Sequence, residues 1–202
     1  MKKNQTTIAR QVDLPLSLRE RTRLLMLEEV RQVAFRLFAE QGFEKTTVEQ
    51  IAAQSGLSRT TFFRYFGSKE EIILGRISEI GVMVAEALKA ISSEEIPWKA
   101  LRQAFETIVT GVATDEKNAL VMMRLLSDAS ALTTRRWEKE QGWQSLLVPL
   151  ILPRLNGNLL QANALVASAI CCLEAATDEW MACKNEVPLG LLLDQSMEIF
   201  NR

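Results

Sequence analysis

The chain has 202 residues, of which 48% are hydrophobic and 24% are charged, and its net charge is −1. This composition is typical of a water-soluble globular protein, and no window of about 18 residues is continuously apolar, so we expect no transmembrane helix and no membrane partner. Histidine is absent, which removes histidine-based general bases, Ser-His and Cys-His nucleophile pairs and the commonest metal ligand. We therefore predict no catalytic residues, no metal site, no cofactor and no enzymatic activity.

The charges are distributed unevenly along the chain. Residues 1–70 hold 12 Lys+Arg against 8 Asp+Glu, whereas residues 71–202 hold 12 against 17. Phosphate binding needs a locally basic surface rather than a basic protein, so this distribution fits a basic nucleic-acid-binding part on an acidic body. Ordinary scatter of charge is the alternative interpretation.

The first elements are a polar arm and two helices. Residues 1–17 contain basic residues but no apolar run, which predicts a flexible basic arm and no secretory signal. From Leu18 onward apolar residues recur at helical spacing, and Gly42 is placed to end this first helix with a positive φ. A second helix is expected to start at Thr46 or Thr47, because either residue can form a capping box with a side chain three residues later.

A tight turn is predicted between the second helix and a third one. The second helix ends at Ser55-Gly56, where the glycine supplies a left-handed residue, and Ser58 is a good N-cap for a helix over 59–66 that Gly67 ends. Two short helices joined by such a turn form a helix-turn-helix, which places its second helix in the DNA major groove. We therefore assign residues 18–67 to a helix-turn-helix DNA-binding domain.

Caps and prolines predict the remaining helices, which complete an all-α fold of about nine helices. Within the seventh helix Pro149 is expected to produce a kink, and Pro153 is expected to end it. The expected ranges after the third helix are 69–91, 97–112, 115–131, 133 or 134 to about 152, 159–184 and 188–200.

The third helix has one face suited to the core and one suited to DNA. Phe62 and Phe66 take the inward positions, so Arg59 is turned outward, where it can bond guanine O6 and N7. Nearby hydroxyl groups can contact base edges, and the amides at the start of the second helix can bond phosphates. Nearby cations can contact phosphates or enter the minor groove. An ordinary capped helix with solvated arginines is the alternative. The predicted DNA-contacting residues are Arg19, Arg21, Arg23, Thr46, Thr47, Ser58, Arg59, Thr60, Thr61, Arg64, Tyr65 and Lys69.

The segment AFRLFAEQGFEKTTVEQIAAQSGLSRTTFFRYFGSKEEII resembles the DNA-binding domain of the tetracycline-repressor (TetR) family of bacterial regulators. The resemblance covers about residues 20–72. It implies a three-helix DNA-binding head on a helical body, so residues 68–202 are expected to form an effector-binding and dimerisation domain. Phe63 stands where many members have tyrosine, which removes a phosphate-bonding hydroxyl. The matching positions are Phe38, Gly42, Thr46, Thr47, Ile51, Ala52, Gly56, Ser58, Phe62, Phe63, Tyr65, Phe66 and Lys69.

Methionine and tryptophan in the second half suit a large, adaptable apolar cavity. Arg124, Glu174 and Asp178 are candidate polar anchors for a ligand, and surface charges are the alternative. The candidate ligand-binding residues are Phe105, Met122, Met123, Leu126, Trp143 and Trp180, with Ile108, Val109 and Leu147 as further wall residues, and plain core packing is the alternative for each.

The last two helices carry small residues and leucines, which permit close helix packing. The resemblance implies that they pair with a second copy of the chain as a four-helix interface, and packing within one chain is the alternative. The predicted dimer contacts are Leu165, Ala169, Cys172, Leu192 and Met197. The chain has three cysteines, Cys171, Cys172 and Cys183, a number and spacing that do not suit a disulfide framework. We therefore expect a reduced, cytoplasmic protein in which the cysteines are small apolar packing residues. Redox sensing is the alternative.

These patterns lead to one hypothesis. The chain is expected to be a homodimeric, ligand-responsive repressor that binds a palindromic operator in double-stranded DNA, with a second copy of itself and an apolar small-molecule effector as partners. Three alternatives stay open: a lipophile-binding helical protein with a vestigial DNA-binding head, a helical enzyme, and a transcriptional activator.

Overall fold

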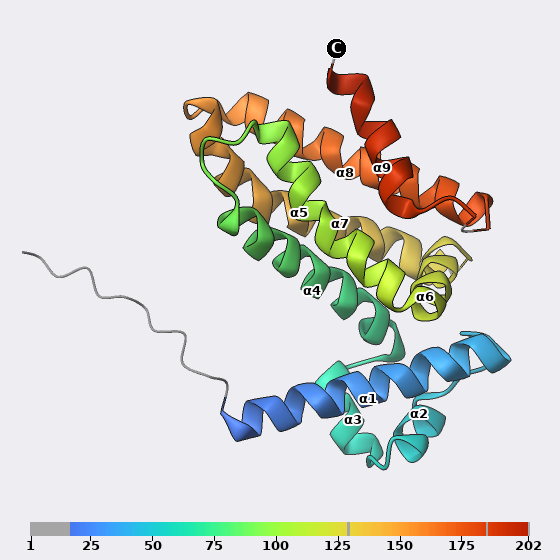
Figure 1. Cartoon of the computed structure of the whole chain (residues 1–202). Helices are drawn as coiled ribbons and strands as arrows, with labels where there is room; N and C mark the ends of the chain where they lie inside the picture. Colours follow the sequence, from blue (N-terminus) through green and yellow to red (C-terminus); the bar gives the residue numbers. More distant parts are fainter. Residues whose placement is uncertain (1–16, 129, 185, 202) are drawn as a thin grey trace, which may run out of the picture.

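The computed structural model describes residues 17–128, 130–184 and 186–201, so the predicted arm lies outside the described residues apart from Ser17. These residues contain helices and no strand, which confirms the all-α prediction (Figure 1). Two 3-10 helices, η1 (Leu152–Leu155) and η2 (Ile199–Asn201), follow α7 and α9. The α-helices are α1 (Leu18–Gln41), α2 (Val48–Gln54), α3 (Arg59–Phe66), α4 (Lys69–Ala90), α5 (Pro97–Thr114), α6 (Glu116–Asp128), α7 (Ser130–Ile151), α8 (Leu159–Ala182) and α9 (Leu189–Glu198).

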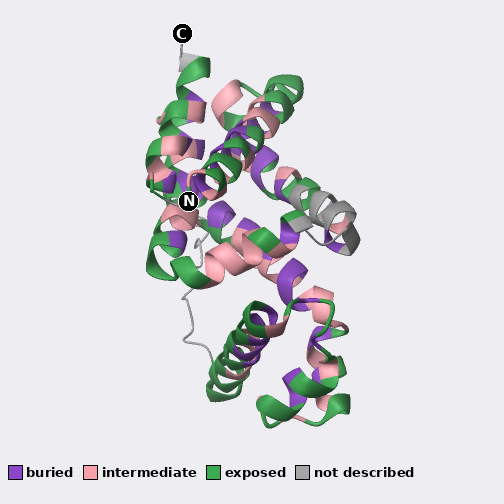
Figure 2. Ribbon diagram, turned by 90° about the vertical axis from the view of Figure 1, so that its right-hand side faces the viewer, coloured by how far each residue is buried: buried purple, intermediate pink, exposed green. Residues whose placement is uncertain are grey.

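Helices α1–α3 form a head that lies against one end of a helical body made by α4–α9 (Figure 1). Each head helix begins at a side-chain cap. Ser17 and Thr47 form capping boxes, and Ser58 accepts a hydrogen bond from the third amide of α3. Phe62, which is fully buried, and Ile51 fill the small core between these helices, where Figure 2 shows the buried positions.

The structure decides between the two predicted starts of α2 and moves the start of α7. Of the two predicted alternatives, Thr47 is the N-cap of α2, because Thr46 is buried and its hydroxyl is bonded to Gly42. Helix α7 begins at Ser130, three residues earlier than the first predicted start. The helix continues through Pro149 to Ile151, near its predicted end, and the 3-10 helix η1 that follows contains Pro153. Packing of α7 along α4 therefore outweighs the local preferences from which its start was predicted.

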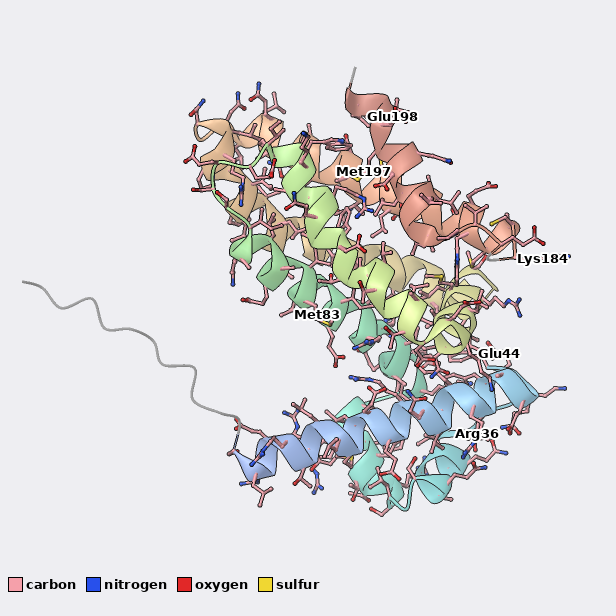
Figure 3. The ribbon with its side chains drawn as sticks, viewed as in Figure 1. Arg36, Glu44, Met83, Lys184, Met197 and Glu198 are labelled. Atoms are coloured by element: carbon pink, nitrogen blue, oxygen red, sulfur yellow. The ribbon has the colours of Figure 1, made fainter. Side chains whose placement is uncertain are left out.

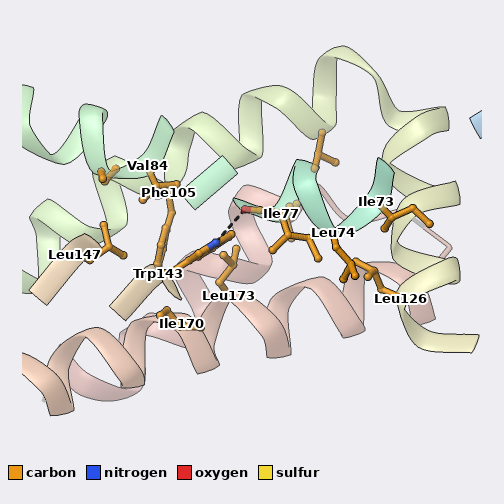
Figure 4. Packing of buried hydrophobic residues seen from close by; sticks show 14 of the residues in the cluster. Ile73, Leu74, Ile77, Val84, Phe105, Leu126, Trp143, Leu147, Ile170 and Leu173 are labelled. Atoms are coloured by element: carbon orange, nitrogen blue, oxygen red, sulfur yellow. Dashed lines mark hydrogen bonds between the residues drawn. The ribbon is translucent and has the colours of Figure 1, made fainter. Parts of the chain in front are cut away.

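The body is built around α4, which packs against both α5 and α7, while α8 packs between α7 and α9. Figure 4 shows the core at this centre. The indole Nε1 of Trp143 donates a hydrogen bond of 3.0 Å to the carbonyl of Ile77. Leu147 and Phe105 are fully buried beside it, so α4, α5 and α7 share one continuous apolar interior.

Side-chain contacts join α1 of the head to the body. Arg31 of α1 pairs with Glu79 of α4, and the Gln32 side-chain carbonyl accepts a hydrogen bond of 2.7 Å from Asn118 of α6. Within the body, Glu71 in the first turn of α4 pairs with Arg135 of α7. Figure 3 shows the two layers with their side chains, with the head below and the body above. A change inside the body can therefore reach the head through α1 as well as through α4.

Helix α8 has the length and apolar composition of a membrane-spanning helix, although its apolar run is interrupted by Asn163 and Glu174. Within its most apolar window 39% of the residues are buried inside this chain. The core helix of a globular protein meets the same criteria, so this is weak evidence for a membrane span. The remaining residues of that window leave an apolar face that the chain itself does not cover.

Candidate nucleic-acid interface and ligand cavity

Helix α3 is anchored by one face and open on the other. Phe62 and Phe66 stack at 5.3 Å between ring centroids and are 0% and 8% exposed, so they fix the helix to the head core. Arg59, Thr60 and Arg64 are exposed on the opposite side. A helix held this way presents its first turn to any surface that the head docks against.

The start of α3 is locally ordered before any partner binds. The Ser58 hydroxyl accepts the Thr61 amide at 3.1 Å and shares a hydrogen bond of 2.8 Å with the Thr61 hydroxyl. Arg59 pairs with Glu49 of α2 at 3.0 Å, and its guanidinium lies 5.5 Å from the ring centroid of Phe63. Both charged side chains of that pair are more than half exposed, so the ion pair is weak and a phosphate or base edge can displace it.

Two predicted DNA contacts have an internal role instead. Thr46 is 1% exposed, its hydroxyl donates to the Gly42 carbonyl at 2.8 Å and its amide donates to the Phe43 carbonyl at 3.2 Å. The Lys69 ammonium donates to the carbonyls of Phe43 and Thr46 at 2.8 and 3.2 Å and lies 4.3 Å from the Phe43 ring centroid. Thr46 and Lys69 therefore hold the loop before α2, and the structure corrects their expected role at the DNA surface.

The other predicted contacts lie near the surface of the head. Thr47 is exposed, and its hydroxyl caps α2 by accepting a hydrogen bond of 3.2 Å from the Gln50 amide. Tyr65 is half-buried, and the Arg64 guanidinium lies 5.0 Å from its ring centroid. The remaining predicted contacts are exposed on the first turns of α1, namely Arg19, Arg21 and Arg23.

A cavity of about 200 Å³ lies between α1 and the body helices. Its apolar wall includes Met122, Met123, Leu126 and Trp143, four of the six candidate ligand-binding residues. Phe105 and Trp180 are buried outside the lining, so their prediction as wall residues is wrong and they serve as core. Both are large and apolar, a property that core and cavity residues share, so the sequence alone does not distinguish the two roles.

The polar part of the cavity lining was missed in the sequence. The polar lining residues are Glu28, Arg31 and Gln32 of α1, Arg76 of α4, Thr107 of α5, Asp115, Asn118 of α6, and Glu174 and Thr177 of α8. Of the three candidate polar anchors only Glu174 lines the cavity, whereas Arg124 and Asp178 are exposed and lie outside the lining. The one available signal was the position of Arg31, one helical turn before the inward-facing Phe35.

The outer face of α8 and α9 differs from the predicted dimer contacts. Ala169, Cys172 and Met197 are at most 6% exposed because α8 and α9 pack against each other, so a partner chain cannot reach them without opening that packing. Burial also raises the pKa of the Cys172 thiol, which favours the unreactive neutral form. Leu165 and Leu192 are half-buried, and the exposed apolar stripe consists of Leu160, Ala164, Cys171, Ala175 and Leu191.

Comparison with known proteins agrees with this architecture. Residues 30–75 match the sequence profile described as "Bacterial regulatory proteins, tetR family". The HTH-type transcriptional regulator TcmR of Streptomyces glaucescens is 32% identical over 143 residues, which are 68% of this chain and 63% of that protein. The chain thus spans somewhat less than two thirds of that relative's length.

Two solved structures extend the likeness to the body. Thermus thermophilus FadR, a TetR-family transcriptional repressor in complex with lauroyl-CoA, superposes with a TM-score of 0.62 at 21% identity and covers 86% of this chain and 92% of its own. The triclosan complex of SmeT from Stenotrophomonas maltophilia gives a TM-score of 0.62 at 19% identity, with 87% and 91% covered. At these identities the likeness concerns the fold alone.

Proposed function

Because this chain belongs to the TetR family of bacterial regulatory proteins, we propose that it is a ligand-responsive transcriptional repressor acting as a homodimer on double-stranded DNA. Residues 18–67 are the DNA-binding domain in this proposal, and residues 68–202 bind the effector and the second subunit. We place its action in the cytoplasm, where the DNA is, and we assign it no enzymatic activity.

The observation that carries the proposal is the open face of α3. Arg59, Thr60 and Arg64 are exposed there, while Phe62 and Phe66 hold the helix rigidly against the head. An arginine at the start of a helix that enters the major groove can bond guanine O6 and N7 with both arms of its guanidinium, and threonine offers a hydroxyl or a methyl to a base edge. The Arg59–Glu49 pair keeps the arginine close to this position until DNA replaces the carboxylate.

The apolar stripe on α8 and α9 supports assembly into a dimer. Leu160 and Leu191 are 80% and 55% exposed, and Ala164 and Ala175 are small enough to let a second pair of helices approach closely. A two-fold axis through this stripe would present two α3 helices to successive major grooves, about 34–36 Å apart on a palindromic site.

The cavity supports regulation by a small apolar effector. FadR of Thermus thermophilus and SmeT were solved with lauroyl-CoA and triclosan, both of which carry large apolar parts. Four methionines line the cavity here, Met83, Met122, Met123 and Met181, and their flexible side chains adapt to differently shaped ligands. Since α1 of the head contributes to the lining, a ligand that fits one position of α1 better than another shifts the DNA-binding equilibrium.

A footprint on the DNA upstream of the protein's own coding sequence tests the proposal. The purified full chain is expected to protect a palindromic site, and the affinity should fall steeply with salt because phosphate contacts release counterions. Absence of protection, or binding that does not change between about 50 and 200 mM salt, would contradict a DNA-binding role.

A further inference from the structure

Two arginines from different layers meet at the polar part of the cavity. Arg31 belongs to α1 of the head and Arg76 to α4 of the body, and both line the cavity. Glu79 of α4 pairs with both of them, with Arg76 at 3.5 Å. Glu28 pairs with Arg31 at 3.3 Å from its own helix. Arg31 and Glu79 are thus the charged link between head and body at the cavity.

The Arg31 side chain is only 11% exposed, and its Nε is buried without a hydrogen-bond acceptor anywhere in the described part of the chain. A buried donor without an acceptor is destabilising, and native proteins usually satisfy such groups. The neighbouring acceptors are engaged elsewhere, since Glu28 and Glu79 bond the terminal nitrogens and Asp115 accepts from Asn118. The Arg31 Nε therefore marks a place for an acceptor that the described chain does not supply.

The carboxylates around Arg31 differ from it in their access to water. Glu28 and Glu79 are 50% and 42% exposed, so either can turn into solvent at little cost. Arg31 cannot do so, because most of its side chain is enclosed. An anion that enters the cavity can therefore replace Glu79 on the terminal nitrogens of Arg31.

From this arrangement we infer that the effector is an amphipathic anion, with a carboxylate or phosphate oxygen bound by Arg31 and Arg76 and an apolar part against Met122, Met123 and Trp143. This inference rests on the proposed function and names the chemistry of its ligand. A guanidinium matches the geometry of carboxylate and phosphate oxygens, which accept two parallel hydrogen bonds from it.

The inference also gives the ligand a direct effect on the head. When the anion displaces Glu79, the ion pair between α1 and α4 is lost, and the ligand itself becomes the bond between the two helices. The position of α1 then depends on the ligand rather than on Glu79. A neutral ligand of the same shape would fill the apolar part of the cavity but would leave the Arg31–Glu79 pair in place.

Four probes with the same ten-carbon chain test the charge preference by isothermal titration calorimetry on the full-length protein without DNA: decanoate, decyl phosphate, decanol and decylamine. The cavity of about 200 Å³ is at the small end of ligand pockets, which favours a medium chain. Decanoate or decyl phosphate should bind about tenfold or more tightly than decanol. Equal affinities for decanoate and decanol, or tightest binding of decylamine, would overturn the inference.

Variants locate the anion. Arg31→Met should bring decanoate to the affinity of decanol, and Glu79→Gln should strengthen decanoate binding because it removes the competing carboxylate. Arg36→Met is the matched control, since Arg36 lies on the same helix, is exposed and does not line the cavity. The comparison of the four probes on the unmodified chain needs no variant, so it decides the outcome even if Arg31→Met folds poorly. If the protein binds decanoate but protects no DNA in the footprint, the proposed function is contradicted while the inference about the ligand stands.

Discussion

The indole of Trp143 occupies the space that a side chain on Gly81 would need. A β-carbon built on Gly81 would lie 2.5 Å from the indole Nε1, closer than any real carbon contact. The glycine thus lets α7 approach α4 and lets Trp143 bond the Ile77 carbonyl on the wall of the cavity. Glycine is unfavourable inside a helix, but the packing of α7 on α4 requires a glycine at position 81.

Gly81→Ala should therefore destabilise the protein by about 1–3 kcal/mol, because the methyl group displaces the indole. Thermal unfolding should move down by several degrees, and the tryptophan emission should shift as the indole becomes more exposed. Gly75→Ala is the control in the same helix. A β-carbon there meets nothing within 4 Å, so it should leave stability unchanged or raise it by about 0.5–1 kcal/mol. Equal effects of the two substitutions would exclude the close contact.

Lys69→Met should destabilise the head through the loss of two hydrogen bonds from a charged donor, by about 2 kcal/mol. The amides of Thr46 and Thr47 should exchange hydrogen faster in this variant. Lys45→Met, in the same loop and exposed, serves as the control. If Lys69→Met leaves stability unchanged but weakens DNA binding, Lys69 contacts a DNA phosphate instead of holding the loop.

Ala164→Arg, and separately Ala175→Arg, should convert the dimer to a monomer, because each places a charge on the exposed apolar stripe of α8. Sedimentation velocity measures the outcome directly. Ala90→Arg, at the exposed end of α4, is the control and should remain dimeric. If both α8 variants sediment like the unmodified chain, the two subunits meet elsewhere.

The cap of α1 should depend on pH. Hydrogen bonds from the Ser17 hydroxyl and amide lower the pKa of Glu20 below its ordinary value. The stabilisation is therefore present above the pKa of a free glutamate and is lost as the pH falls through the lower folded pKa. The protection factor of the Glu20 amide against hydrogen exchange, taken relative to the intrinsic exchange rate at each pH, should fall on acidification through that range. In Glu20→Gln the protection of this amide should not change over the same pH range. If the pH dependence persists in this variant, a group other than Glu20 causes it.

The short helices of the head could be predicted from local chemistry. Ser58 and Gly67 fix both ends of α3 within their own neighbourhood, and the observed bounds agree with the prediction. Thr46 and Thr47 could not be distinguished in the same way. Both offer capping boxes, and the choice depends on the burial of Thr46, whose hydroxyl bonds the Gly42 carbonyl in the folded chain.

The cavity and the dimer face could be predicted only in part. Helical periodicity shows that a residue faces inward, but not whether its neighbour is a ligand, another helix of the chain or a second copy. The family resemblance predicts Cys172 and Met197 at the interface, whereas α8 and α9 bury them against each other. Arg31 was missed because its partner Glu79 lies 48 residues further along the chain.

Fluorescence anisotropy with Arg59→Ala tests the central claim most directly. The protected operator duplex and a scrambled duplex of the same composition are titrated at one salt concentration with the unmodified chain and the variant. The variant should lose about 1–3 kcal/mol of operator affinity and bind the scrambled duplex almost unchanged, because Arg59 contacts a base edge. An unchanged preference for the operator would show that α3 does not read the DNA.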